Sequence, residues 1–146
     1  MATIIATPSP LGCYNSNGLS EYQTSGAGAS AGGSTVTLNI AQGSGNVTVY
    51  VSPKYKTLKI EANGRIETLD PGYDWVKVSV DGKEVLYRES TQDNDECDYE
   101  TVSASATVSL PICNACGTMV YVEGAPNDNI CNDGVSWTVT LTPQEN

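Results

Sequence analysis

The sequence predicts an all-β protein, an antiparallel β-sandwich of about eight strands with a flexible N-terminal arm. Three observations support this fold class. Val and Thr are abundant and Leu is sparse, a composition that favours strands over helices. From Ser34 onward apolar residues recur at every second position, as in strands with one buried face. No segment shows helical spacing, and jelly-roll and immunoglobulin-like topologies both fit.

Each predicted strand is a short alternating run bounded by turn-forming residues. The runs are 34–41, 46–52, 57–62, 74–80, 83–90, 101–110, 118–124 and 135–142. "QGSG" links the first two runs, and "NGR" at Asn63 to Arg65 is a tight-turn signal. Asp81-Gly82 predicts a second tight turn.

The first part of the chain differs from the rest in composition. Residues 1–33 hold a single charge, Glu21, and end in the Gly/Ser/Ala-rich run "TSGAGASAGG". We therefore predict an N-terminal arm at 1–33 and a β-sandwich domain at 34–146. Apolar and aromatic residues of the arm are candidates for docking on a neighbouring subunit, with a disordered tail as the alternative: Ile4, Ile5, Leu11, Tyr14, Leu19 and Tyr22.

The charge balance disfavours several classes of partner. The net charge is −10, whereas nucleic acids and anionic membranes attract Lys and Arg. All basic residues lie between Lys54 and Arg88, and every charged residue from Glu89 onward is acidic. "MATIIATPSPLG" lacks the features of a signal peptide, and no apolar run approaches the ~18 residues of a membrane span. We expect synthesis in the cytoplasm and no membrane partner.

The absence of histidine argues against an enzyme. Without His, the chain cannot form a Ser-His-Asp triad, a Cys-His dyad or a His-ligated catalytic zinc. No carboxylate pair stands out as glycosidase machinery either. We therefore expect no catalytic residues and no organic cofactor.

The cysteines raise the question of zinc, redox chemistry or disulfides. Cys113 and Cys116 form one C-x-x-C, but structural zinc sites of this kind usually show two. A thioredoxin-type C-x-x-C begins a helix, whereas this one lies in a strand connection. The strand predicted at 101–110 is roughly 30 Å long, which separates Cys97 and Cys131 from this pair.

This geometry favours two disulfides, Cys97 with Cys131 and Cys113 with Cys116, while Cys13 stays free or competes for a partner. Reduced structural thiols and zinc are the alternatives. Disulfides imply an oxidising final environment.

Acidic loops flank two of these cysteines. "DNDECDYE" and "NDNICND" offer hard oxygen ligands for calcium, although the spacing does not match an EF-hand loop. The candidate ligands are Asp93, Asp95, Asp98, Asp128 and Asp133. Solvated Asx turns are the alternative interpretation.

The "MATI" start, the Gly-rich arm and the Val/Thr-rich sandwich together resemble small β-sandwich virion proteins of bacteriophages: head-decoration, head-fibre or tail-surface modules. The resemblance is architectural and assigns no functional residues. It implies a non-catalytic, homo-oligomeric structural subunit on the surface of a virion or extracellular particle, with other subunits of the same assembly as partners.

A carbohydrate-binding module, with or without calcium, is the alternative function. Surface glycan would then be the partner, and aromatic rings would supply the stacking faces. The candidates are Tyr50, Tyr55, Tyr73, Trp75, Tyr87, Tyr99 and Tyr121, for which packing in the core or in an interface is the competing role.

Overall fold

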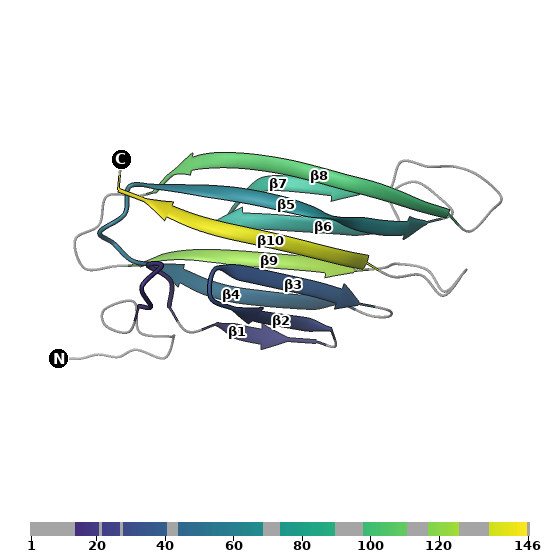
Figure 1. Ribbon diagram of the computed structural model, residues 1–146, viewed down its shortest axis with the longest axis horizontal. Helices are drawn as coiled ribbons and strands as arrows, with labels where there is room; N and C mark the ends of the chain where they lie inside the picture. Colours follow the sequence, from purple (N-terminus) through teal and green to yellow (C-terminus); the bar gives the residue numbers. More distant parts are fainter. Residues whose placement is uncertain are drawn as a thin grey trace.

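A computed structural model of the chain describes residues 14–20, 22–26, 28–40, 44–68, 74–89, 98–110, 117–125 and 135–145. These residues form two antiparallel five-stranded sheets packed face to face, which confirms the predicted β-sandwich (Figure 1). Sheet A has the order β1-β4-β9-β6-β7, and sheet B has the order β2-β3-β10-β5-β8. No described segment forms a helix that is long and apolar enough to cross a membrane.

The strands alternate between the two sheets along most of the chain. Sheet A contains β1 (Gln23–Ser25), β4 (Gly45–Val51), β6 (Trp75–Val80), β7 (Lys83–Glu89) and β9 (Thr118–Ala125). Sheet B contains β2 (Ala29–Gly32), β3 (Thr35–Ile40), β5 (Thr57–Thr68), β8 (Asp98–Ser109) and β10 (Val135–Gln144).

The strand order is that of a jelly roll. β3 pairs with β10, β4 with β9, β5 with β8, and β6 with β7, so the chain from β3 to β10 is one long hairpin wound over the core. Two Greek keys result, and they decide between the two topologies that the sequence left open.

The core lies between the sheets and consists of the inward residues of each alternating run. Its largest fully buried side chains include Trp137, Leu38, Leu58, Ile60 and Leu141. Burying a Val or Leu side chain fully contributes about 1.5–3 kcal/mol, so the alternation itself supplies much of the driving force for folding.

The described part of residues 14–33 is built into the sandwich, which corrects the expectation that this segment is a separate arm. Leu19 is 0% exposed and bridges Val51 of β4. The amide of Ser20 donates to the carbonyl of Tyr50 at 2.8 Å, and its hydroxyl accepts from the amide of Tyr50, also at 2.8 Å. Leu19 therefore packs in its own chain and does not dock on a neighbour.

The Gly/Ala-rich run contributes the edge strands β1 and β2. Ala29 and Ala31 face the core from β2, and Gly33, at φ 59°, turns the chain into β3. Tyr22 packs against the core and its hydroxyl donates to the carbonyl of Gly33 at 2.7 Å. The low hydrophobicity of alanine and glycine concealed this alternation in the sequence.

The two predicted tight turns had opposite outcomes. Asp81 and Gly82 both have positive φ, 54° and 79°, and join β6 to β7 as the sequence predicted. The turn predicted at Asn63 to Arg65 is wrong, because these residues continue β5 in register with both β8 and β10. Gly64 serves a close approach of two backbones instead.

Candidate functional site

The outer face of sheet A carries a row of aromatic side chains from four neighbouring strands. Tyr50 of β4, Tyr121 of β9, Trp75 of β6 and Tyr87 of β7 are each partly buried and alternate with fully buried core residues. Because successive side chains of a strand point to opposite faces, all four rings lie on the solvent side of one sheet. We call this surface the sheet A aromatic face.

The register of the strands sets how these rings are spaced. Tyr121 lies opposite Ser79 of β6, and Tyr87 lies opposite Lys77. Tyr50 lies opposite Met119, one outward position along β9 from Tyr121. Neighbouring strands are about 4.8 Å apart, and Tyr87 is offset from Tyr121 by two residues along the strands, so the backbones of Tyr121 and Tyr87 are separated by roughly 12 Å across β6.

Lys77 is the central cation of the sheet A aromatic face. Its Nζ lies 5.6 Å from the centroid of the Trp75 ring and 3.9 Å from Oε1 of Glu123. A partly exposed contact of either kind contributes at most about 1 kcal/mol. The chief consequence of the two contacts is therefore to restrain the Lys77 side chain among the rings.

Two tyrosines of this face are paired with a glutamate two positions further along the same strand. The hydroxyl of Tyr87 donates to Oε2 of Glu89 at 3.2 Å. Burial raises the pKa of Tyr87 above its ordinary value, and the charges of Glu89 and Glu84 and the Glu89 hydrogen bond raise it further. Burial, followed by the charge and hydrogen bond of Glu123, likewise raises the pKa of Tyr121.

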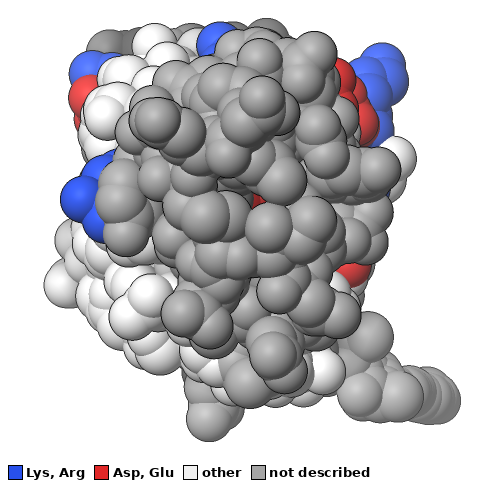
Figure 2. Space-filling model, turned by 90° about the vertical axis from the view of Figure 1, so that its right-hand side faces the viewer, with Lys and Arg blue, Asp and Glu red and all other residues white. Residues whose placement is uncertain are grey.

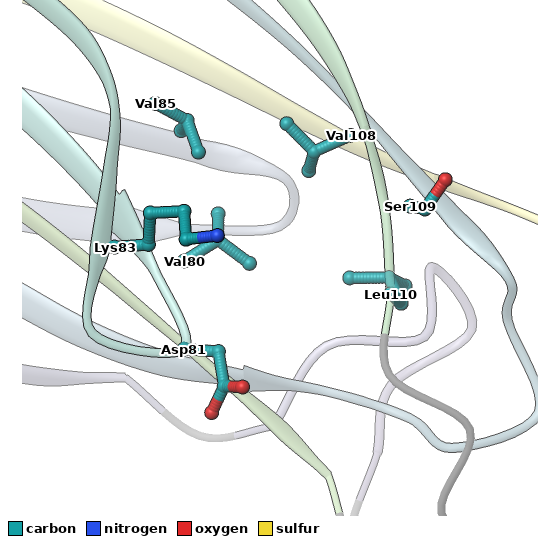
Figure 3. A pocket seen from close by; sticks show the side chains of 7 residues that line it. All are labelled: Val80, Asp81, Lys83, Val85, Val108, Ser109 and Leu110. Atoms are coloured by element: carbon teal, nitrogen blue, oxygen red, sulfur yellow. The ribbon is translucent and has the colours of Figure 1, made fainter.

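A cleft of about 530 Å³ lies between the β6–β7 turn and the end of β8 (Figure 3). Val85 and Val108 point toward each other across it, and Leu110 points in from the chain after β8 (Figure 3). The Lys83 side chain extends over the opening, whereas the Asp81 carboxylate points away from it (Figure 3). The lining combines the apolar side chains of Val80, Val85, Val108 and Leu110 with three polar residues, Asp81, Lys83 and Ser109.

A second groove, of about 500 Å³, is lined by Glu61 and Asn63 of β5, Ser103 to Ser105 of β8, and Arg88 of β7. The hydroxyl of Ser103 donates to Oδ1 of Asn63 at 3.0 Å. Viewed from the end of the sandwich, basic and acidic side chains are interspersed around its rim (Figure 2).

The structure brings together four of the seven aromatic candidates. Tyr55 lies apart from the face, beside Gly18, where a Cβ would come within 2.2 Å of the Tyr55 ring. Tyr73 lies outside the described residues, and the described features of Tyr99 are limited to its backbone in β8. Of the arm candidates, Ile4, Ile5 and Leu11 also lie outside the described residues, and Tyr14 is partly buried.

The proposed calcium ligands and all five cysteines fall outside what the structure describes, apart from the backbone of Asp98 at the start of β8. Within the described ranges, no group of three or more Cys, Asp or Glu side chains could hold a metal ion.

The strands that follow Cys97 and Cys131 in the sequence begin at the same end of sheet B. β8 begins at Asp98 opposite Thr68, and β10 begins at Val135 opposite Ile66, so both start at the same end of β5. Ser109 lies opposite Thr57 at the other end of β5, on the side from which the chain leads to Cys113 and Cys116. The pairings themselves stay predictions.

The sequence reasoning missed the polar members of the aromatic face: Lys77, Glu89 and Glu123. A signal was present, because Tyr-x-Glu occurs twice at strand spacing, at Tyr87 to Glu89 and at Tyr121 to Glu123. Its meaning depends on both strands lying in the same sheet.

No protein-family model and no curated protein matches the chain. Among solved structures, it is similar to the secreted serine protease VesC from Vibrio cholerae, with a TM-score of 0.52 and 12% identity over 79% of this chain. The chain spans only 22% of that protease chain.

A family 35 carbohydrate-binding module from Clostridium thermocellum gives a TM-score of 0.37 at 11% identity, covering 84% of this chain and 88% of the module. The PA14 sugar-binding domain of an RTX adhesin gives 0.35 at 11% identity, covering 70% of this chain and 48% of that chain. Likeness at such identities concerns the fold alone.

Proposed function

We propose that the chain is a non-catalytic binding domain that uses the sheet A aromatic face to bind carbohydrate. The observation that carries this proposal is the placement of Tyr50, Trp75, Tyr87 and Tyr121 on one solvent-facing sheet surface. Rings held half-buried on strands lose little entropy on binding, and they present apolar area to the C–H faces of sugar rings.

The polar groups between the rings complement this apolar area. The carboxylates of Glu89 and Glu123 accept hydrogen bonds from sugar hydroxyls, and Lys77 donates to sugar oxygens. A few placed polar groups among apolar ones are the usual means by which a site orients a ligand. Sugars present both kinds of surface at once, which fits this face better than a purely apolar or a strongly charged ligand.

Binding to immobilised polysaccharides tests the proposal. We expect retention of the protein on at least one neutral, acidic or amino-sugar polysaccharide. Tyr121→Ala should weaken binding about 2- to 12-fold, the cost of one aromatic contact. Tyr121→Phe keeps the ring and should bind nearly as the wild type does, and Thr138→Ala on the outer face of sheet B is the off-face control. Absence of retention on the whole panel, or unchanged binding by Tyr121→Ala, would contradict the proposal.

A structural role in a virion or extracellular assembly is the second candidate, as a capsid decoration, fibre or tail surface protein. The observation that favours it is the long edge strand β8, whose residues 101–109 carry no charge and provide a surface for subunit contact. Ile4, Ile5 and Leu11 stay candidates for binding a neighbouring subunit. Mass spectrometry and electron microscopy of the particle fraction test this role: a chain found free and monomeric, yet retained on polysaccharide, favours the first function alone.

A further inference from the structure

In the described part of the chain, the two sheets have four edge strands, and three of them carry features that discourage pairing with another chain. β1 and β2 are only 3 and 4 residues long. β7 carries the charges of Lys83, Glu84, Arg88 and Glu89 and has a register shift opposite Val78/Ser79. Short length, charge and bulges are the common protections of sheet edges.

The fourth edge strand, β8, lacks these protections from Thr101 to Ser109, beyond Asp98 and Glu100 at its start. It is 12 residues long and pairs with β5 at every position from Asp98 to Ser109 without a register shift. Residues 101–109 contain no charge and no proline. Among the described strands, β8 pairs with β5 alone, and it lies along one side of the sandwich (Figure 1).

Among the described residues of β7, Arg88 lines the second groove together with Ser103 to Ser105 and Glu61. Its Nη1 donates to the carbonyl of Tyr87 at 2.7 Å, so the guanidinium is occupied with the edge of its own strand. Arg88 is exposed, and a long exposed side chain can move aside at small cost.

The sequence of β8 is self-complementary. "TVSASATVS", residues 101–109, reads the same in both directions by side-chain class: hydroxyl, Val, hydroxyl, Ala, hydroxyl, Ala, hydroxyl, Val, hydroxyl. An antiparallel pair centred on Ser105 would therefore place Thr101 opposite Ser109, Val102 opposite Val108 and Ala104 opposite Ala106. A two-fold interface requires this self-matching of one surface.

The position of the charged residues favours the same antiparallel pairing. Antiparallel pairing about Ser105 places Glu100 of one copy opposite Leu110 of the other. Parallel pairing in register would place Glu100 beside Glu100, and like charges directly opposite destabilise a strand pair. With a net charge of −10 per chain, an uncharged contact strand also keeps the acids of two copies apart.

We infer that β8 pairs antiparallel with β8 of a second copy of this chain, about a two-fold axis at Ser105. The two five-stranded sheets B then form one continuous sheet. The sheet A aromatic faces stay open in this dimer, because β8 belongs to the opposite sheet. Backbone hydrogen bonds supply the affinity, as in other strand-addition contacts.

Sedimentation of the full chain under reducing conditions tests the inference. We expect the wild type to sediment near twice its 15.4 kDa mass. Ser105→Lys should sediment as a monomer at the same concentration, because two ammonium groups would face each other across the axis. Ser105 is exposed and lies opposite Glu61 of β5, so a lysine is tolerated in the monomer. Ser30→Lys, the same change on the short edge strand β2, should stay dimeric.

Hydrogen exchange provides the second measurement. Amides of residues 101–109 should exchange more slowly in the wild type than in the Ser103→Lys/Ser105→Lys double variant at equal concentration. A monomeric wild type at about 100 µM, a concentration well above typical specific dimer dissociation constants, would overturn the inference. So would a dimer that persists in both lysine variants with unchanged exchange of β8, since the contact would then lie elsewhere.

Discussion

Gly64 of β5 lies directly opposite Trp137 of β10, and the two backbones approach so closely that no other residue type fits at position 64. A Cβ there would come within 2.1 Å of the Ser136 carbonyl oxygen and 2.8 Å of the Trp137 Cα. Trp137 is 1% exposed and is the largest fully buried side chain among the described residues. The glycine thus secures the pairing that holds this tryptophan between the sheets.

Substitution of this glycine should destabilise the protein. Gly64→Ala forces the Ser136 carbonyl and the β10 backbone to shift, and overpacking of this kind typically costs about 1–3 kcal/mol. Urea unfolding followed by Trp fluorescence measures the change. Gly32→Ala is the matched control, because nothing lies within 4 Å of a Cβ at Gly32. Equal stabilities of the two variants would show that β10 is not held against β5 as described.

Truncation of Leu19 should reveal that the N-terminal segment belongs to the core. Leu19→Ala removes a side chain that is 0% exposed, and such changes cost about 2–5 kcal/mol. Gln23→Ala, on the exposed edge strand β1, should leave the free energy of unfolding nearly unchanged. For the same reason, deletion of residues 1–33 should yield an unstable chain. A fully stable deletion product would restore the expectation of a detachable arm.

Stability should fall in alkali, and Tyr87 and Tyr121 should contribute to the decline together with Tyr14 and Tyr22, whose pKa values burial also raises. All four have pKa values raised above the ordinary 10.0 in the folded state, so the folded chain binds more protons than the unfolded chain once the pH exceeds about 10. Their contribution is fully present below pH 10 and is lost as the pH rises through the folded pKa values. Tyr87→Phe/Tyr121→Phe should flatten the decline between pH 10 and 12. The free energy of unfolding of each protein is measured against its own value at pH 8. If the double variant loses stability with pH as steeply as the wild type does, the assignment is contradicted.

Oxidation should link Cys97 to Cys131, since β8 and β10 begin at the same end of β5. Closing a loop of about 34 residues contributes roughly 3–4 kcal/mol in the chain-entropy model, less any strain. Reduction should therefore lower the midpoint of urea unfolding, whereas a chelator should not. Non-reducing peptide mapping identifies the bridge, and Cys97→Ser should match the reduced wild type. One zinc per chain, lost together with the fold on chelation, would refute the disulfide assignment.

The sequence predicted the strands most reliably where large apolar residues alternate. Val76, Val78 and Val80 are inward as expected, because a β-branched residue at every second position has one stable arrangement in water. The prediction failed at Ala29 and Ala31. Alanine contributes little free energy when it is buried, so an alternating Ala strand cannot be distinguished by its sequence from a Gly/Ser-rich linker. It also failed at Gly64, where a glycine needed for close backbone approach resembles one needed for a turn.

The candidate site could not be read from the sequence in the same way. Tyr50, Trp75, Tyr87 and Tyr121 are each visible as outward residues of a strand, but they come from four strands that are scattered along the chain. Alternation says which face of a strand a ring occupies, and it says nothing about which other strands share that face.

Local period-two patterning by itself determined the fold class, the inward residues of β3, β4, β6 and β9, and the Asp81-Gly82 turn. Tertiary structure alone decided the jelly-roll order, the inclusion of residues 14–33 in the sheets, the gathering of four aromatic rings on sheet A and the exposure of β8 as an edge. The physical reason is that alternation reflects the burial of each strand taken singly. Strand order depends instead on pairing between residues far apart in the chain, such as β3 with β10, whose free energy no local segment contains.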